Sequence, residues 1–249
     1  MSLDGSVTVV MGATGGIATE LCRRIAACGG KLVLSARDES RLAPLARELE
    51  AVAITGDATN PDTAERAVAA AVERHGRIDA AVNCVGSILL KPAHLTSVDE
   101  WRQTIATNLD SSFYLVRAAA KAMTAPGSQG GSIVLCSSAV ARHGYANHEA
   151  IAAAKAGIIG LMLSAAATYA PKGIRLNCVA PGLTNTPLAA RLVANEASLK
   201  ASLAMHADGR LGEPADVASA IEWLIDPVNR HVTGQVLAID GGLGSLRAR

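Results

Sequence analysis

Aromatic residues and long hydrophobic runs are scarce in this sequence of 249 residues. It contains two Trp, three Tyr and one Phe, too few for the stacking platforms by which proteins bind single-stranded nucleic acids. Half of the residues are hydrophobic, yet no apolar run approaches the roughly 20 residues that a membrane-spanning helix requires. The first residues, MSLDGSVTVVMGATGG, lack the basic start and apolar core of a signal peptide. We therefore expect a cytoplasmic protein that binds neither nucleic acid nor membrane.

An excess of one charge and a disulfide pattern are also missing. The net charge is +1, and basic residues are mixed with acidic ones along the chain, so no charged surface for polyanions is expected. The five cysteines are an odd, scattered set inside apolar segments, which favours buried free thiols and a reducing compartment. The six histidines have no metal-ligand spacing, and we expect no metal site.

Apolar, strand-like runs alternate with alanine-rich helical segments along the chain. The expected strands cover residues 6–10, 31–35, 51–55, 79–83, 132–136, 174–180 and 235–239. Fully apolar strands separated by helices predict a parallel sheet with helices on both faces. We predict a single α/β domain over residues 1–249, with a doubly wound, Rossmann-like sheet that binds ligands at the carboxyl ends of its strands.

A glycine-rich turn, Gly12-Ala13-Thr14-Gly15-Gly16-Ile17-Ala18, follows the first expected strand. Glycines permit a tight turn and let backbone N–H groups approach a pyrophosphate at the start of a helix, although an ordinary strand-to-helix turn has the same composition. The second strand ends in Ala36-Arg37 instead of the acid that holds the ribose hydroxyls of NAD. Arg37 is either a solvated arginine at a helix start or a ligand of the 2′-phosphate of NADP.

The central segment, residues 133–157, combines a buried strand, two serines, a loop and an alanine-rich helix that carries Lys155. It resembles the catalytic segment of the short-chain dehydrogenase/reductase family, in which a serine at the strand end is followed about a dozen residues later by Tyr-x-x-x-Lys. Ser138 and Lys155 match this pattern, and Ile151 occupies the position of the tyrosine. Further matching motifs occur in the family's order from Val7 to Gly242, so the resemblance covers almost the whole chain.

The resemblance implies a nicotinamide cofactor, with NADP expected rather than NAD because of Arg37. Asp57 corresponds to the acid that hydrogen-bonds the adenine amino group, and Pro181 to Thr186 to the element that covers the nicotinamide. Gly15 stands where many NADP-using relatives have a second basic residue. The cofactor-binding residues implied by the resemblance are Gly12, Thr14, Gly16, Ile17, Arg37, Asp57, Ala58, Asn83, Gly86, Lys155, Pro181, Gly182 and Thr186.

The catalytic residues implied by the resemblance are Ser138, which stabilises a carbonyl oxygen, Lys155, which binds the nicotinamide ribose, and Asn108, which kinks the central helix and holds a water. Ile151 cannot donate a proton. His148 is our candidate replacement, because six residues separate it from Lys155, the spacing of the catalytic Tyr and Lys in enoyl reductases. A helix-start role for His148, and Tyr145 as the donor instead, remain open.

These observations predict an NADP-dependent oxidoreductase that acts on a small-molecule carbonyl or conjugated enone with an atypical proton donor. The alternative is a catalytically degenerate protein that binds the cofactor and serves as a partner subunit. Residues 183–209, rich in small apolar groups, are the expected substrate lid. The small-residue face of the helix over residues 150–169 predicts a homo-oligomer, a tetramer or a dimer, although a core helix has the same composition.

Overall fold

The computed structural model describes residues 3–246 and contains one parallel seven-stranded sheet in the order β3-β2-β1-β4-β5-β6-β7. The strands are β1 (Val7–Met11), β2 (Lys31–Ala36), β3 (Val52–Thr55), β4 (Ala80–Asn83), β5 (Gly131–Cys136), β6 (Ile174–Pro181) and β7 (Val236–Ile239). Each begins and ends within one residue of its predicted position. The predicted doubly wound α/β fold is confirmed, and the strand order reverses between β1 and β4.

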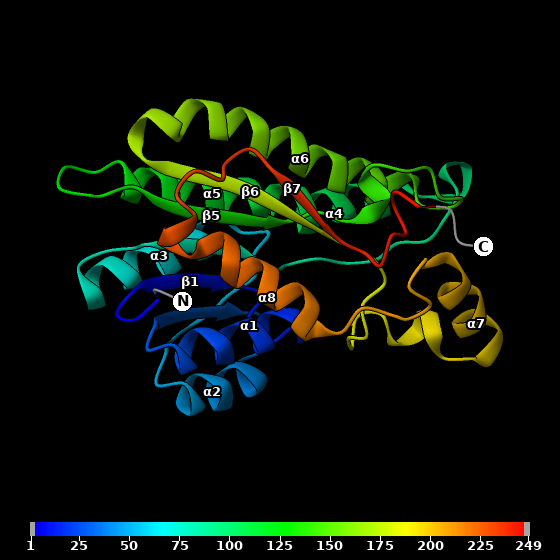
Figure 1. Ribbon diagram of the computed structural model, residues 1–249, viewed down its shortest axis with the longest axis horizontal. Coiled ribbons are helices and arrows are strands. Elements are labelled where there is room, and N and C mark those ends of the chain that lie inside the picture. The colour runs from blue at the N-terminus through cyan, green and yellow to red at the C-terminus, as the bar shows by residue number, and fades with distance from the viewer. Residues whose placement is uncertain (1–2, 247–249) are drawn as a thin grey trace.

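Helices cover both faces of the sheet (Figure 1). One face carries α1 (Gly16–Ala27), α2 (Glu39–Glu48) and α8 (Pro214–Ile225); the other carries α3 (Pro61–His75), α5 (Ser111–Met123) and α6 (Glu149–Tyr169). The apolar strands supply both cores, because successive side chains point to opposite faces: Val9 lies in one core and Val10 in the other.

The central helix is interrupted where Asn108 was predicted to kink it. α4 (Val98–Ile105) passes through a π-helical stretch, Ala106–Asp110, before α5 begins. Asn108 lies in this stretch and is fully buried. A wider turn of this kind places one residue out of the regular helical register, which is common at functional sites.

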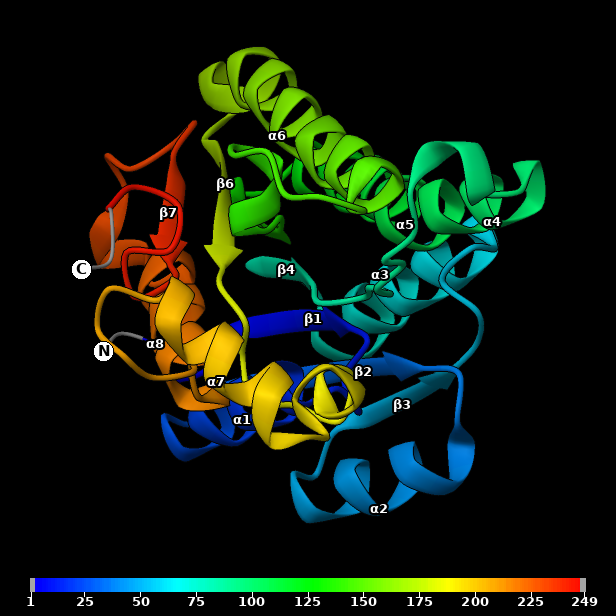
Figure 2. The same cartoon turned by 90° about the vertical axis from the view of Figure 1, so that its right-hand side faces the viewer.

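Residues 183–212, between β6 and α8, form an excursion from the sheet that contains a short 3-10 helix (Ala190–Val193) and α7 (Glu196–Met205). α7 stands clear of the sheet, to its right in Figure 1, and so lies in front of β1 and α1 in Figure 2. The two ends of the excursion meet, because the Gly212 N–H donates to the Leu183 carbonyl at 3.0 Å and the Asn185 N–H to the Gly212 carbonyl at 2.8 Å. This segment contains the predicted lid, whose movement stays a prediction.

One helix corrects our expectation about hydrophobic runs. The helical segment Glu149–Lys172, which begins as α6, has the length and mean hydropathy (1.8) of a membrane span. The core helix of a globular protein can meet the same two criteria. Ile158 and Met162 of α6 are fully buried against the sheet.

Candidate active site

A cleft of about 480 Å³ lies at the carboxyl ends of β1 to β4, where the strand order reverses. Residues 186–188, at the start of the excursion, close one side of it. This is the position at which doubly wound sheets bind ligands. Nine of the predicted cofactor residues line the cleft: Gly12, Thr14, Gly16, Ile17, Arg37, Asp57, Ala58, Gly86 and Thr186.

The glycine turn at the base of the cleft has the backbone that the sequence predicts. Gly12 has a φ of +74°, and a Cβ on it would lie 3.0 Å from the Val85 nitrogen, so both conformation and space require glycine. α1 begins directly after the turn and has neither a side-chain cap nor an acidic residue in its first turn. Its N-terminus is thus left open to an anion, as a pyrophosphate site requires.

Charged residues of both signs line the cleft where β2 and β3 end. Arg37 is exposed and has no hydrogen bond or ion pair within residues 3–246. Asp57 accepts two hydrogen bonds from Thr59, which lower the pKa of its carboxyl, with a smaller contribution from Arg37. Asp38 also lines this end, but its carboxylate caps α2 by accepting from the Ser40 hydroxyl at 2.6 Å and from the Arg41 N–H at 3.4 Å.

Arg41 is a lining residue that sequence reasoning missed. Its Nη2 donates to the Thr14 carbonyl in the glycine turn at 2.7 Å. Arg41 lies four residues after Arg37 and is part of no sequence motif. It reaches the cleft only because of the direction in which α2 leaves the sheet.

Lys155 and Asn108 meet behind the cleft at Gly86. A Cβ on Gly86 would lie 3.3 Å from Asn108 Oδ1 and 3.5 Å from Lys155 Nζ. The Lys155 ammonium donates to the Cys136 carbonyl at 2.8 Å. Burial lowers the pKa of Lys155, since it disfavours the charged form. The structure thus brings together two of the predicted catalytic residues and one predicted cofactor residue.

The buried Asn108 amide has the partners that its burial demands. Its Nδ2 donates to Ser87 Oγ and to the Thr104 carbonyl, both at 2.9 Å, and its Oδ1 accepts from the Ser87 N–H at 3.2 Å. Ser87, which sequence reasoning missed, therefore locks the turn after β4 onto the central helix. This arrangement holds Gly86 beside Lys155.

The two serines after β5 have different roles. Ser137 is buried and donates to the Lys155 carbonyl at 2.9 Å, which ties α6 to the end of β5. Ser138 is half-buried, and its hydroxyl accepts a weak hydrogen bond from the Val140 N–H at 3.4 Å. Within residues 3–246 the hydroxyl of Ser138, the predicted catalytic serine, donates no hydrogen bond, so its proton is available to another acceptor.

The region around the missing tyrosine contains two titratable side chains. Ile151 is buried, with 4% of its surface exposed. His148 lies one residue before α6, not within its first turn, and its Nδ1 lies 2.7 Å from the Ala146 carbonyl. Because a carbonyl only accepts, Nδ1 carries a proton and Nε2 is the atom left for proton exchange. Tyr145 contacts the His148 ring, with centroids 5.7 Å apart, and donates to the Leu243 carbonyl at 3.1 Å.

Four predicted cofactor residues do not line the cleft: Lys155, which lies beside Gly86, and Asn83, Pro181 and Gly182. Asn83 is buried; it donates to Ser111 and Ser112 and accepts from the Val85 N–H, so it shapes the turn that presents Gly86. Pro181 and Gly182 lie at the end of β6. A Cβ on Gly182 would lie 3.0 Å from Nε2 of the buried His206. Within residues 3–246 no group of three or more potential metal ligands occurs.

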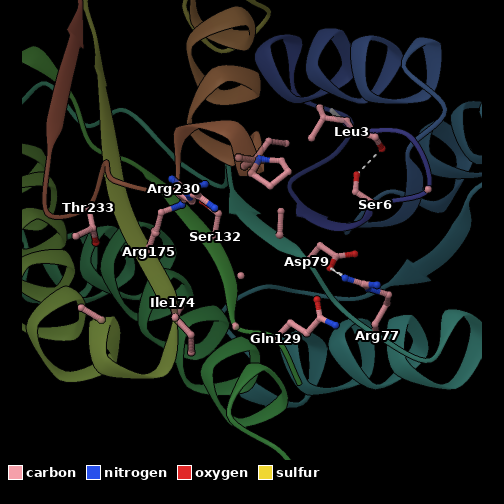
Figure 3. Close-up of a pocket in the computed structure, with 18 of the residues that line it drawn as sticks. Leu3, Ser6, Arg77, Asp79, Gln129, Ser132, Ile174, Arg175, Arg230 and Thr233 are labelled. Carbon is pink, nitrogen blue, oxygen red and sulfur yellow. Dashed lines mark hydrogen bonds and ion pairs between the residues drawn. The ribbon is translucent and has the colours of Figure 1, made fainter. Parts of the chain in front are cut away.

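A second cavity, of about 490 Å³, lies at the opposite edge of the sheet (Figure 3). The loops before β1, β4, β5, β6 and β7 line it, and no predicted site residue does. Arg77 Nε donates to Asp79 at 2.9 Å within one loop, whereas Arg175 links two segments by donating to the carbonyls of Val232 and Asp226 at 3.2 and 3.3 Å. This cavity is separate from the candidate active site.

Known proteins resemble this chain over almost its whole length. The family described as enoyl-(acyl carrier protein) reductase matches residues 12–244. Galactitol 2-dehydrogenase (L-tagatose-forming) of Cereibacter sphaeroides is 35% identical, covering 96% of this chain and 95% of that protein. A 3-oxoacyl-(acyl-carrier-protein) reductase of Vibrio cholerae is 33% identical, covering 98% and 99%. A solved short-chain type dehydrogenase/reductase from Mycobacterium ulcerans superposes with a TM-score of 0.93 at 29% identity, covering 100% and 93%.

Proposed function

The chain belongs to the short-chain dehydrogenase/reductase family, and on that premise we propose that it is an NADP-dependent oxidoreductase acting on a small-molecule carbonyl or conjugated enone. The observation that carries this proposal is the cleft at the strand-order reversal. It joins a glycine turn, an open helix N-terminus and an unpaired arginine in one cavity.

The residues of the cleft fit the successive parts of a dinucleotide. The N-terminus of α1 binds the pyrophosphate, Asp57 accepts from the adenine, and Arg37 binds the 2′-phosphate. Asp38 is occupied as the cap of α2 and so does not replace the acid that NAD-selective relatives use. When bound, the cofactor supplies or accepts the hydride.

We assign the polar part of the reaction to Lys155, Ser138 and His148. Lys155 donates to the nicotinamide ribose from a position fixed by the Cys136 carbonyl and the Ser137 hydroxyl. The free proton of Ser138 stabilises the substrate oxygen as charge develops on it. His148 exchanges the proton through Nε2, the ring nitrogen that the Ala146 contact leaves available.

The substrate class follows from the family and from the missing tyrosine. Relatives named for sugar alcohols and for oxoacyl chains share the chemistry of a secondary alcohol and its ketone. Six residues separate His148 from Lys155, which is also the spacing of the catalytic Tyr and Lys in ene-reducing relatives. A ketone and an enone are therefore both in the proposal.

A second candidate function is cofactor binding without catalysis. It is favoured by the burial of Ile151, which puts an apolar group at the position of the usual acid, and by the contact that holds His148 to its own loop. Retention of Ser138, Asn108 and Lys155 favours the enzyme, because a binding protein has no need of all three.

Calorimetric titration with NADPH and NADH, followed by rate measurements on a panel of ketones, sugar alcohols and enones, tests the proposal. The enzyme predicts tighter binding of NADPH and turnover that Ser138→Ala slows without weakening the cofactor. Tight NADPH binding with no turnover on any substrate supports the second candidate. Equal or tighter binding of NADH refutes the NADP assignment.

We also propose that the protein is cytoplasmic and forms a homo-oligomer, a tetramer or a dimer. Phe113 on α5 and Leu163 on α6 are 48% and 50% exposed, which is unusual for large apolar side chains on core helices. A second copy of the chain would cover them. Light scattering after size exclusion measures the assembly, and a monomer at micromolar concentration contradicts it.

A further inference from the structure

Two arginines, Arg37 and Arg41, line the same cleft from different elements. Arg37 follows β2, whereas Arg41 lies in the first turn of α2. Asp38, between them, caps α2 through the Arg41 backbone N–H and so fixes where the helix starts. The Arg41 guanidinium then reaches back over the glycine turn to the Thr14 carbonyl.

Neither guanidinium forms a hydrogen bond or ion pair with a carboxylate of residues 3–246, although the charge of Arg37 helps to lower the pKa of Asp57 and that of Arg41 helps to lower the pKa of Asp38. Within the described part of the chain, Arg37 has no hydrogen bond, and the Arg41 guanidinium has one, to the Thr14 carbonyl. The two nearest acids are otherwise engaged, Asp38 with Ser40 and Asp57 with Thr59. Two positive charges that line one cavity repel each other, and a bound anion that contacts both would relieve that repulsion.

We propose that Arg41 is a second specificity-determining residue for NADP, which binds the 2′-phosphate together with Arg37. This inference rests on the NADP dependence proposed above. The Arg41 guanidinium places a positive charge at the carbonyl of Thr14, the residue before Gly15. The glycine turn itself contains no basic side chain. The charge that many relatives carry in the glycine turn comes here from the neighbouring helix.

The Thr14 contact also orients Arg41 before the ligand arrives. A guanidinium has five N–H donors in a planar fork, so one can be held by a carbonyl while others remain for phosphate oxygens. An arginine that is already held loses less conformational freedom on binding. A lysine at this position retains the charge but cannot make both contacts in the same planar geometry.

Calorimetric titration of the full-length protein with NADPH and with NADH tests the proposal. The variants are Arg41→Ala, Arg41→Lys and Arg37→Ala. Arg47→Ala is the matched control, because Arg47 lies on the same helix, is exposed and donates to a backbone carbonyl, that of Ala43, but does not line the cleft. Adenosine 2′-monophosphate and adenosine 5′-monophosphate, compared as ligands, isolate the phosphate position.

We expect Arg41→Ala to weaken NADPH and adenosine 2′-monophosphate by at least about tenfold, as for the loss of one charge-assisted hydrogen bond, while NADH and adenosine 5′-monophosphate change by less than about twofold. Arg41→Lys should be intermediate, and Arg47→Ala should bind like the unmodified protein.

Three results overturn the inference. If Arg41→Ala weakens NADPH and NADH equally, Arg41 only supports the glycine turn. If Arg41→Ala behaves like Arg47→Ala while Arg37→Ala removes the NADPH preference, Arg41 has no part in selectivity and the proposed NADP function stands. If the unmodified protein shows no preference for NADPH, both the inference and the NADP assignment fail.

Discussion

Replacing His148 tests whether this chain has a new proton donor in place of the missing tyrosine. General acid catalysis contributes about 10²–10⁴-fold, so His148→Ala should raise the barrier by roughly 2.7–5.4 kcal/mol. The structural role of the side chain is much smaller. It makes one hydrogen bond, to the Ala146 carbonyl, and one ring contact, with Tyr145, and the lost hydrogen bond costs only about 0.5–1.5 kcal/mol of folding free energy.

The assay is the initial rate of reduced-nicotinamide consumption on the best ketone or enone, with cofactor affinity measured separately by calorimetry. We expect kcat to fall by the catalytic factor while the Kd for NADPH stays within about twofold, since His148 does not line the cleft. His148→Asn is the matched control. Its amide can replace the Nδ1 contact with Ala146 but cannot exchange a proton, so it should be as slow as His148→Ala.

Two results refute this reasoning. A rate for His148→Ala within about threefold of the unmodified enzyme assigns His148 to the start of α6, because so small a change is below the range of general acid catalysis. Full activity of His148→Asn together with low activity of His148→Ala shows that the residue supports the loop and moves the search for a donor to Tyr145.

Three further predictions concern other residues. Lys155→Met should weaken cofactor binding and abolish turnover, yet leave thermal stability unchanged or higher, because burial already disfavours the charged amine. Normal cofactor affinity in this variant would contradict the role of Lys155. Ile151→Tyr should raise the rate of ketone reduction and lower the free energy of unfolding in urea by about 1–3 kcal/mol, because the site is buried. A folded, NADPH-binding variant without added activity would show that the missing tyrosine is not the only departure from the family's active site. Hydrogen bonding from Lys91 lowers the pKa of Glu100 from 4.5 to about 2. The ionised carboxylate therefore stabilises the fold fully above about pH 4.5, and this contribution is lost as the pH falls from about 4.5 toward 2. Glu100→Gln should flatten the acid limb of a plot of unfolding midpoint against pH over that range, and an unchanged limb would contradict the assignment.

The sheet could be predicted from the sequence because its strands are fully apolar runs that end in turn residues. Such runs are typical of parallel sheets covered on both faces. The inner strands β1, β4 and β6 are fully buried here, whereas the edge strands β3 and β7 are partly exposed. The glycine turn could be predicted for a similar local reason, since the positive φ of Gly12 and its contact with Val85 exclude a side chain.

Side-chain partners could not be predicted, because they depend on how distant segments meet. The burial of Asn108 required a partner, but its identity, Ser87, is set by the turn after β4. The start of α6 is decided by Asn147, whose φ of +64° breaks the helix before His148 and whose carbonyl accepts from the Lys91 N–H at 2.7 Å. Neither the strain nor the distant contact is visible in the local pattern.

The junction at Leu183 and Gly212 makes the middle of the excursion a replaceable cassette. Its two ends are hydrogen-bonded to each other beside the sheet, and the Asp208 N–H donates to the Gly241 carbonyl, so the chain is anchored on both sides of residues 190–205. Doubling the length of such a closed loop costs only about 0.6 kcal/mol in closure entropy. Residues 190–205 can therefore be exchanged for a segment of different length and composition, while residues 186–188 stay because they line the cleft. This offers a route to a new substrate range on an unchanged cofactor-binding scaffold.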